Sequence, residues 1–142
     1  MWSYSRDVNY YETDRMGVIH HSNYLRILEE ARMAWMKENL IPYPEIENRG
    51  IIVPFTESNA TFISFLRFGD TFRVDMELVR FTGLRMVFRY RVYNETTGEL
   101  WHKAETVHYT TTREDYKPTS VKRTHPDLFE ALKALVSDTM ED

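Results

Sequence analysis

One long amphipathic helix, expected over residues 24–40, constrains the fold of this chain more than any other feature. Its apolar side chains recur at helical spacing and make a wide stripe: Tyr24, Ile27, Leu28, Ala31, Ala34 and Trp35. Charged side chains occupy most of the opposite face: Arg26, Glu29, Glu30, Arg32 and Lys37. Pro42 and Pro44 prevent the helix from continuing. Because so wide a stripe has to be buried, we expect the helix to pack against a sheet.

Strand patterns supply that sheet. The sequence predicts one strand before the helix, over residues 4–11, and four after it, over residues 51–66, 70–82, 85–93 and roughly 100–112. Two neighbouring strands have inward-facing apolar residues: Phe72, Val74, Met76 and Leu78 in one, and Met86, Phe88, Tyr90 and Val92 in the next. With a turn at Gly83, the hairpin should place Asp75 and Glu77 opposite Arg89 and Arg91.

The strand expected over residues 51–66 is long and carries Pro54 near its start. Proline has no N–H to give to a ladder, so it favours an edge strand or a bulge. A long unpaired edge invites pairing with another chain. We therefore expect a homo-oligomer, at least a dimer, with a dimer of dimers preferred.

The remaining signals complete an α+β fold. Thr124, Pro126 and Asp127 should open a short C-terminal helix, with Asp127 as a capping-box acid. A chain of 142 residues is long enough for one domain with its own core, and we expect a single domain over residues 1–142. The order of elements predicts a curved antiparallel sheet of about five strands wrapped around the first helix.

The segment just before the long helix carries the strongest chemical signal. Asp14 lies three positions before Gly17, and His20, His21, Ser22 and Asn23 lead into the helix, whose first N–H groups have no intrahelical acceptor. A carboxylate beside such donors suits the hydrolysis or rearrangement of a carbonyl compound. The alternative is purely structural, because Asp before a Gly turn and Ser or Asn before a helix are also ordinary turn and capping residues.

Residues 11–32 resemble the hydroxybenzoyl-CoA thioesterase-like branch of the hot-dog superfamily, in particular the small bacterial acyl-CoA thioesterases associated with the Tol-Pal envelope system. The matching positions are Thr13, Asp14, Gly17, Val18, Ile19, His20, His21, Ser22, Asn23, Tyr24, Glu29, Glu30, Ala31 and Arg32. The chain departs from the pattern at Arg15 and Met16, where small residues are common, and at His20, where an aromatic residue is usual. These departures bear on the choice of substrate.

The resemblance implies a hot-dog fold and hydrolysis of an acyl-CoA without a cofactor. It makes Asp14 the base or the nucleophile and the backbone N–H of His21 the oxyanion donor, and we count Gly17, a position of the same motif, with them in the catalytic site. It assigns His20, Ser22 and Asn23 to the lining of the substrate site, and it places the active sites at the interface between subunits. Whether Asp14 activates water or attacks directly stays open.

Basic residues near the C-terminus could meet the phosphates of coenzyme A. They are Arg113, Lys117, Lys122 and Arg123, and by resemblance Lys117-Pro118 occupies a basic-Pro position after the last strand. A second group, Arg85, Arg89 and Arg91, lies on one expected strand face. The structural alternative for each group is a solvated strand face or a charged tail.

Several other classes of function lack support. The net charge of −4 does not favour nucleic acid. Residues 1–10 hold no signal pattern, and the longest apolar run, residues 51–55, is far too short to span a membrane, so we expect a cytoplasmic protein. The sequence contains no serine-hydrolase elbow, no P-loop and no dinucleotide fingerprint.

Metal binding is also poorly supported. The chain has no cysteine, which removes thiolate ligands and nucleophiles. His20 and His21 are adjacent and should point apart, and His102, His108 and His125 show no ligand spacing to them.

The sequence therefore predicts a thioesterase that releases free acid and CoA. Two alternatives remain: a hot-dog hydratase or dehydratase, in which a histidine acts on the acyl β-carbon, and a non-catalytic protein that binds acyl thioesters.

Overall fold

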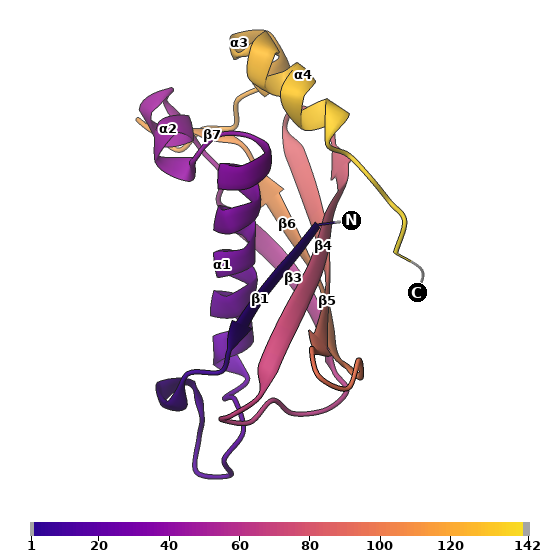
Figure 1. Cartoon of the computed structure of the whole chain (residues 1–142). Helices are drawn as coiled ribbons and strands as arrows, with labels where there is room; N and C mark the ends of the chain where they lie inside the picture. The colour runs from indigo at the N-terminus through magenta and orange to yellow at the C-terminus, as the bar shows by residue number, and fades with distance from the viewer. Residues whose placement is uncertain (1, 141–142) are drawn as a thin grey trace.

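The centre of the molecule is a five-stranded antiparallel sheet that curves around one long helix (Figure 1). The structure is a computed structural model and describes residues 2–140. The strands lie in the order β1 (Trp2–Asp7), β4 (Thr71–Phe81), β5 (Arg85–Asn94), β6 (Leu100–Tyr109) and β3 (Phe55–Phe62). The helix α1 (Ser22–Asn39) crosses one face of the sheet. This is the hot-dog architecture that the order of sequence patterns predicts.

Shorter elements gather at the two ends of α1. The 3-10 turn η1 (Tyr10–Glu12) lies before the loop that leads into α1. The opposite end of α1 carries α2 (Tyr43–Asn48), the two-residue pair β2 (Ile51–Ile52) and β7 (Thr111–Thr112), and the helices α3 (Val121–Thr124) and α4 (Pro126–Ala134) (Figure 1).

The core lies between α1 and the concave face of the sheet. The predicted stripe of α1 is buried at Tyr24, Ile27, Leu28, Ala31 and Trp35, and so are the predicted inner residues of β4 and β5. Trp35 meets Phe88 edge to face, with ring centroids 5.4 Å apart. The prediction for Arg32 was wrong, because this side chain is buried beside the apolar stripe instead of lying on the outer face.

The β4–β5 hairpin has the predicted register. Asp75 lies opposite Arg91 and Glu77 opposite Arg89. The Arg89 guanidinium forms ion pairs with Glu105 at 3.0 Å and Asp138 at 2.6 Å. Gly83 in the connecting turn has φ +95°, and a Cβ at this position would lie 3.3 Å from the Phe129 ring, so both conformation and space require glycine.

The strand expected over residues 51–66 is interrupted. Pro54 separates β2 from β3 because it has no N–H for the ladder, and the register with β6 shifts between Phe55 and Glu57. After Phe62 the chain leaves the strand. The prediction of an edge strand is confirmed, since β3 pairs with β6 alone and all 8 of its residues are exposed.

Three other boundaries needed correction. The first strand ends at Asp7, because the chain then turns into η1. The last strand ends at Tyr109, and Thr111 and Thr112 pair with β2 in a separate ladder. Asp127 is not a capping-box acid, because α4 begins at Pro126 and Asp127 is only its second residue; its carboxylate accepts a hydrogen bond from Arg49 at 2.8 Å.

The helices are all too short or too polar to be membrane spans. No helix within residues 2–140 combines the length and the hydropathy that crossing a bilayer requires.

Candidate active site

A tight loop between η1 and α1 holds the predicted catalytic residues. Thr13 and Ile19 form a bridge across it, and the Asp14 N–H donates to the Val18 carbonyl at 2.9 Å. The Gly17 N–H donates back to the Asp14 carbonyl at 3.0 Å. Gly17 has φ +78°, a conformation that disfavours other residues, so the loop needs glycine here.

The loop is tied to the sheet and to the helix by backbone hydrogen bonds. The Ile19 N–H donates to the Leu66 carbonyl at 2.7 Å. The Glu12 carbonyl accepts two bonds, from the His20 N–H at 2.9 Å and from the Asn23 side-chain amide at 2.8 Å. Asn23 therefore holds the start of α1 against η1 and is not a cap for its own helix.

A partly buried ion-pair cluster, which no sequence pattern indicated, lies beneath this loop. Glu12 is 4% exposed and receives both terminal nitrogens of Arg6 at 2.7 Å and the Asn9 N–H at 2.8 Å. Arg6 also reaches Glu30 of α1 at 2.8 Å. Burial alone would raise the pKa of Glu12, but the bonds from Arg6 and Asn9 outweigh it and lower this pKa. The cluster joins β1, η1 and α1.

Only one of the two carboxylate oxygens of Asp14 takes part in the turn. One oxygen, Oδ1, accepts the Met16 N–H at 2.8 Å, and no described residue donates to the other. The side chain is half-buried. The structural and catalytic interpretations of Asp14 are thus compatible, because the turn uses one oxygen and leaves the second available to a substrate or a water.

The first turn of α1 leaves one backbone donor unused. The Ser22 N–H donates to Nδ1 of the His20 ring at 3.2 Å, and the Asn23 N–H donates to the His20 carbonyl at 2.9 Å. Among residues 2–140, none accepts a hydrogen bond from the His21 N–H. The ring of His20, and not the Ser22 side chain, caps the helix, and the N–H of His21 stays open to a ligand oxygen.

The two adjacent histidines do not point apart as expected. Both are exposed, and their ring centroids lie 4.2 Å apart with an interplanar angle of 31°. The reason is that His21 already has helical backbone angles, φ −54° and ψ −32°, so strand-like alternation does not apply. Within the described part of the chain, no three His, Cys, Asp or Glu side chains are grouped so that they could hold a metal ion.

The sequence model of the thioesterase-like superfamily matches residues 8–132, which include this loop and the whole sheet core. The chain belongs to this superfamily. YneP of Bacillus subtilis (strain 168), a candidate acyl-CoA thioesterase, is 33% identical over 121 residues, covering 85% of this chain and 87% of that protein.

Two further comparisons involve one aromatic thioester. A 1,4-dihydroxy-2-naphthoyl-CoA hydrolase of Thermosynechococcus vestitus (strain NIES-2133 / IAM M-273 / BP-1) is 35% identical over 95 residues, which cover 65% of this chain and 64% of that one. The crystal structure of a DHNA-CoA thioesterase from Staphylococcus aureus matches with a TM-score of 0.88 and 30% identity, covering 93% of this chain and 88% of the other.

In this member of the thioesterase-like superfamily, the predicted phosphate-binding residues lie far from Asp14 within one protomer. Arg113 follows β7, Lys117 lies in the next loop, and Lys122 belongs to α3, all at the end of α1 opposite the Asp14 loop (Figure 1). The helix between them has 18 residues, about 27 Å of length. The Lys122 ammonium lies over the Phe129 ring at 5.6 Å.

The second basic group lies on the outer face of the sheet. Arg89 is engaged by Glu105 and Asp138, so its charge already has partners. Arg91, in the same strand, is buried. This face is therefore the less suitable of the two for phosphates.

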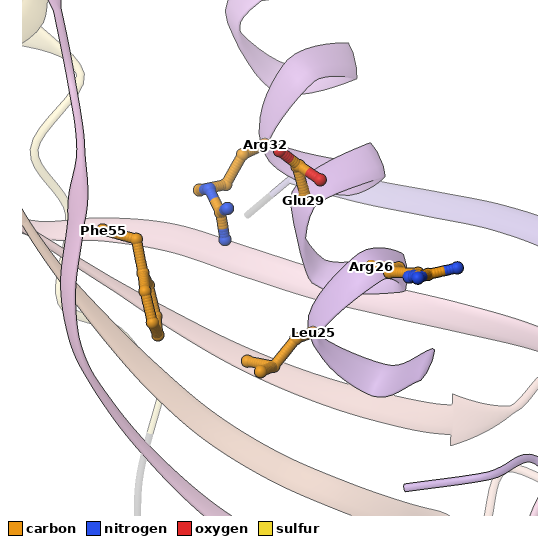
Figure 2. Close-up of a pocket in the computed structure, with 5 residues that line it drawn as sticks. All are labelled: Leu25, Arg26, Glu29, Arg32 and Phe55. Carbon is orange, nitrogen blue, oxygen red and sulfur yellow. The ribbon is translucent and has the colours of Figure 1, made fainter. Parts of the chain in front are cut away.

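A groove between α1 and β3 is the feature that sequence reasoning missed. A cavity of about 200 Å³ is lined by Leu25, Arg26, Glu29, Arg32 and Phe55 (Figure 2). A second cavity, of about 280 Å³, shares Glu29, Arg32 and Phe55 and extends toward α2 and β2. We call the two together the α1–β3 groove. Leu25 lies one helical turn after His21, so the groove opens close to the unused N–H.

Proposed function

We propose that this protein hydrolyses an acyl-CoA thioester to a free acid and CoA. The observation that supports this most directly is the pair formed by the free Oδ2 of Asp14 and the unused N–H of His21, on one loop at the N-terminus of α1. The activities for which the relatives are named, acyl-CoA and 1,4-dihydroxy-2-naphthoyl-CoA hydrolysis, agree with this chemistry.

In the proposed reaction, the thioester oxygen accepts the His21 N–H, where the positive end of the helix dipole stabilises the oxyanion. Asp14 either removes a proton from the attacking water or attacks the carbonyl carbon itself. The tetrahedral intermediate collapses by breaking the C–S bond. In the general-base route the CoA thiolate takes the proton held by Asp14, which restores the carboxylate; in the nucleophilic route the thiolate takes a proton from water. In the nucleophilic route, water then hydrolyses the acyl-aspartyl anhydride and restores Asp14.

The proposal includes pairing of two protomers through β3. A twofold axis through this antiparallel pair would place the Phe55 end of one strand beside the Phe62 end of the other. The Phe55 end lies near β7 and Arg113, and the Phe62 end leads to Leu66, which is bonded to Ile19 of the catalytic loop. Such a dimer would bring the basic residues of one protomer toward the Asp14 of the other, which removes the difficulty of their separation.

In that arrangement Arg113, Lys117 and Lys122 bind the phosphates of coenzyme A. We further propose that the protein is cytoplasmic and forms a homo-oligomer, a dimer or a dimer of dimers. Residues 1–142 then act as a single domain. Membership of the Tol-Pal-associated branch is the finer hypothesis. The activities for which the relatives are named, acyl-CoA and 1,4-dihydroxy-2-naphthoyl-CoA hydrolysis, support the coarser proposal of thioester hydrolysis alone.

The hydratase is the nearest alternative, since it would bind the same thioester. It needs a histidine at the acyl β-carbon, and of the described histidines His102 is enclosed by Tyr24 and Phe62, with ring centroids 4.4 and 4.7 Å away. His108 is held by Thr106. His125 lies at the start of α4, at the end of α1 opposite the Asp14 loop, so the exposed His20 and His21 are the remaining candidates.

Turnover of a panel of acyl-CoAs tests the proposal. Release of free thiol, followed with a thiol reagent, supports the thioesterase. Addition of water with the thioester intact supports the hydratase, and saturable binding without either reaction supports a binding protein.

A further inference from the structure

Arg32 is a buried cation that no carboxylate of the described residues, 2–140, pairs with. Its residue is 8% exposed, and its Nη1 donates to the hydroxyl of Tyr90 at 3.1 Å. No ion pair involving Arg32 forms among residues 2–140. A buried charge that has lost its water is costly unless an opposite charge or several hydrogen bonds replace it.

A chain of hydrogen bonds fixes how Arg32 points. Because the Tyr90 oxygen accepts from Arg32, its own O–H can donate to Thr106 Oγ1 at 2.7 Å. The Thr106 hydroxyl then donates to Nε2 of His108 at 3.0 Å. Burial and, to a smaller extent, the nearby Arg32 cation lower the pKa of His108 to about 4, so the ring is neutral and can accept.

These hydrogen bonds involve only one nitrogen of the Arg32 guanidinium, and none of their acceptors carries a negative charge. The guanidinium has five N–H donors in a planar fork that matches an oxyanion with two oxygens. Figure 2 shows the Arg32 side chain directed into the space between α1 and Phe55. Glu29, the acidic residue of the groove, is exposed and makes no ion pair with it. The free donors therefore face the groove.

The rest of the groove suits an elongated, partly apolar ligand. Leu25 and Phe55 line its outer part, and Met33, Met36 and Phe88 line its inner part. Arg32 lies ten residues after Ser22, about 15 Å along the helix axis. Arg32 lines both cavities, so a ligand that starts at the helix N-terminus and follows the groove would pass Leu25 and Phe55 before it meets the cation.

We propose that the α1–β3 groove receives the acyl group and that Arg32 selects acyl groups whose far end carries an oxyanion. This rests on the proposed thioesterase function and adds the substrate class to it. The oxyanion is a carboxylate at the end of an aliphatic chain or on an aromatic ring. Arg32 is then a specificity-determining residue that contacts substrate without taking part in bond breaking.

Matched substrate pairs test the proposal. In each pair the acyl skeleton is the same and only the distal carboxylate differs: suberoyl-CoA against octanoyl-CoA, and 4-carboxybenzoyl-CoA against benzoyl-CoA. We expect the charged member of at least one pair to have a kcat/KM about tenfold or more higher. The pair that shows the preference identifies the aliphatic or the aromatic source of the oxyanion.

Variants assign the preference to Arg32. Arg32→Gln should reduce kcat/KM for the preferred charged substrate by about tenfold or more, while its uncharged counterpart changes by less than about threefold. Arg32→Lys should recover part of the loss, because it restores the charge without the fork. Lys37→Gln, which removes an exposed positive charge from the same helix outside the groove, should leave both substrates unchanged.

A binding measurement separates this inference from the function on which it rests. Calorimetric titration of the wild-type protein with suberate and octanoate, and with terephthalate and benzoate, needs no turnover. Tighter binding of a dicarboxylate that Arg32→Gln abolishes supports the groove even if no acyl-CoA is hydrolysed. The role of Arg32 in the groove is contradicted if acyl-CoA is hydrolysed with no preference for the charged substrate. It is also contradicted if Arg32→Gln lowers kcat/KM equally for both members of a pair. Either result leaves the proposed thioesterase function intact. If Arg32→Gln does not fold, the wild-type preference and Arg32→Lys still decide.

Discussion

Two arginines, the half-buried Arg6 and the buried Arg32, have opposite surroundings in this protein. Arg6 is held by two carboxylates, Glu12 and Glu30, and lies beneath the loop that carries Asp14. Arg32, on the neighbouring face of α1, has a phenol as its partner and faces a groove. The first arrangement satisfies the charge within the protein and fixes a loop. The second leaves charge and donors for something outside the described chain, which is what a binding site requires.

Acid should lower the free energy of unfolding through the two regions at different pH values, and this is the largest effect that we expect. Burial lowers the pKa of His102 and of His108 to about 4. Between pH 6.5 and 4 the unfolded chain therefore binds more protons than the folded one, and stability falls as pH falls. Each histidine contributes up to about 3 kcal/mol. The pKa of Glu12 is lowered from its ordinary value of 4.5, so the stability that Glu12 contributes is lost only as the pH falls below that value.

Denaturant unfolding at several pH values measures this difference. His108→Gln keeps a hydrogen-bonding side chain and should flatten the dependence between pH 6.5 and 4. Glu12→Gln should leave that interval as steep as in the wild type. A wild-type stability that stays constant down to pH 4.5 would show that neither histidine is kept neutral by burial.

Asp14→Asn tests whether the loop above Arg6 carries the chemistry. We expect kcat to fall by about a hundredfold or more, since amide can neither attack nor take a proton, while the unfolding midpoint changes little. His21→Ala keeps the backbone N–H and should lose much less. Equal losses in the two variants would make the imidazole the base.

Glu12→Gln removes the main partner of Arg6 without changing the size of the side chain. We expect a loss of about 2 kcal/mol in unfolding free energy, because Arg6 keeps Glu30 and Gln keeps part of the hydrogen bonding. The looser loop should also lower kcat several-fold. Glu45→Gln, an exposed acid of α2, is the matched control. If Glu12→Gln is as stable as this control, the cluster beneath the loop does not support it.

The smallest effect should come from the basic residues at the far end of α1. Replacing Lys117 and Lys122 by Gln should raise KM several-fold, corresponding to about 1 kcal/mol for partly exposed contacts to phosphate. Higher salt should raise KM in the same way. Because these residues can reach Asp14 only in another protomer, the effect should be seen where sedimentation shows a dimer or larger assembly. An unchanged KM at both tests would place the phosphates elsewhere.

Sequence patterns could predict the elements whose period is regular. The stripe of α1 and the alternation of β4 and β5 follow from helical and strand periodicity, and the opposition of Asp75 to Arg91 follows from the turn at Gly83. The loop with Asp14 could be found because its residue types are typical of a turn that precedes the start of a helix. Each of these is a local property of the chain.

The parts that failed depend on contacts between distant segments. A helical wheel places Arg32 among the charged residues, and only the position of Tyr90, 58 residues away, shows that it is buried. Glu12 and Arg6 have no distinctive spacing, so their pairing became visible only once β1 and η1 were placed together. The break at Pro54 could be anticipated as a bulge, but its length depends on the separate ladder of β2 and β7.

The exposed edge of β3 also affects how prone newly synthesised protein is to aggregate. Its 8 residues carry a single charge, that of Glu57, and include neither proline nor glycine. An open strand of this composition is a template for indiscriminate cross-β aggregation. A newly made protomer would be at its most vulnerable before it meets a second copy. Variants that weaken pairing through β3 should therefore accumulate as insoluble protein before any loss of catalysis can be measured.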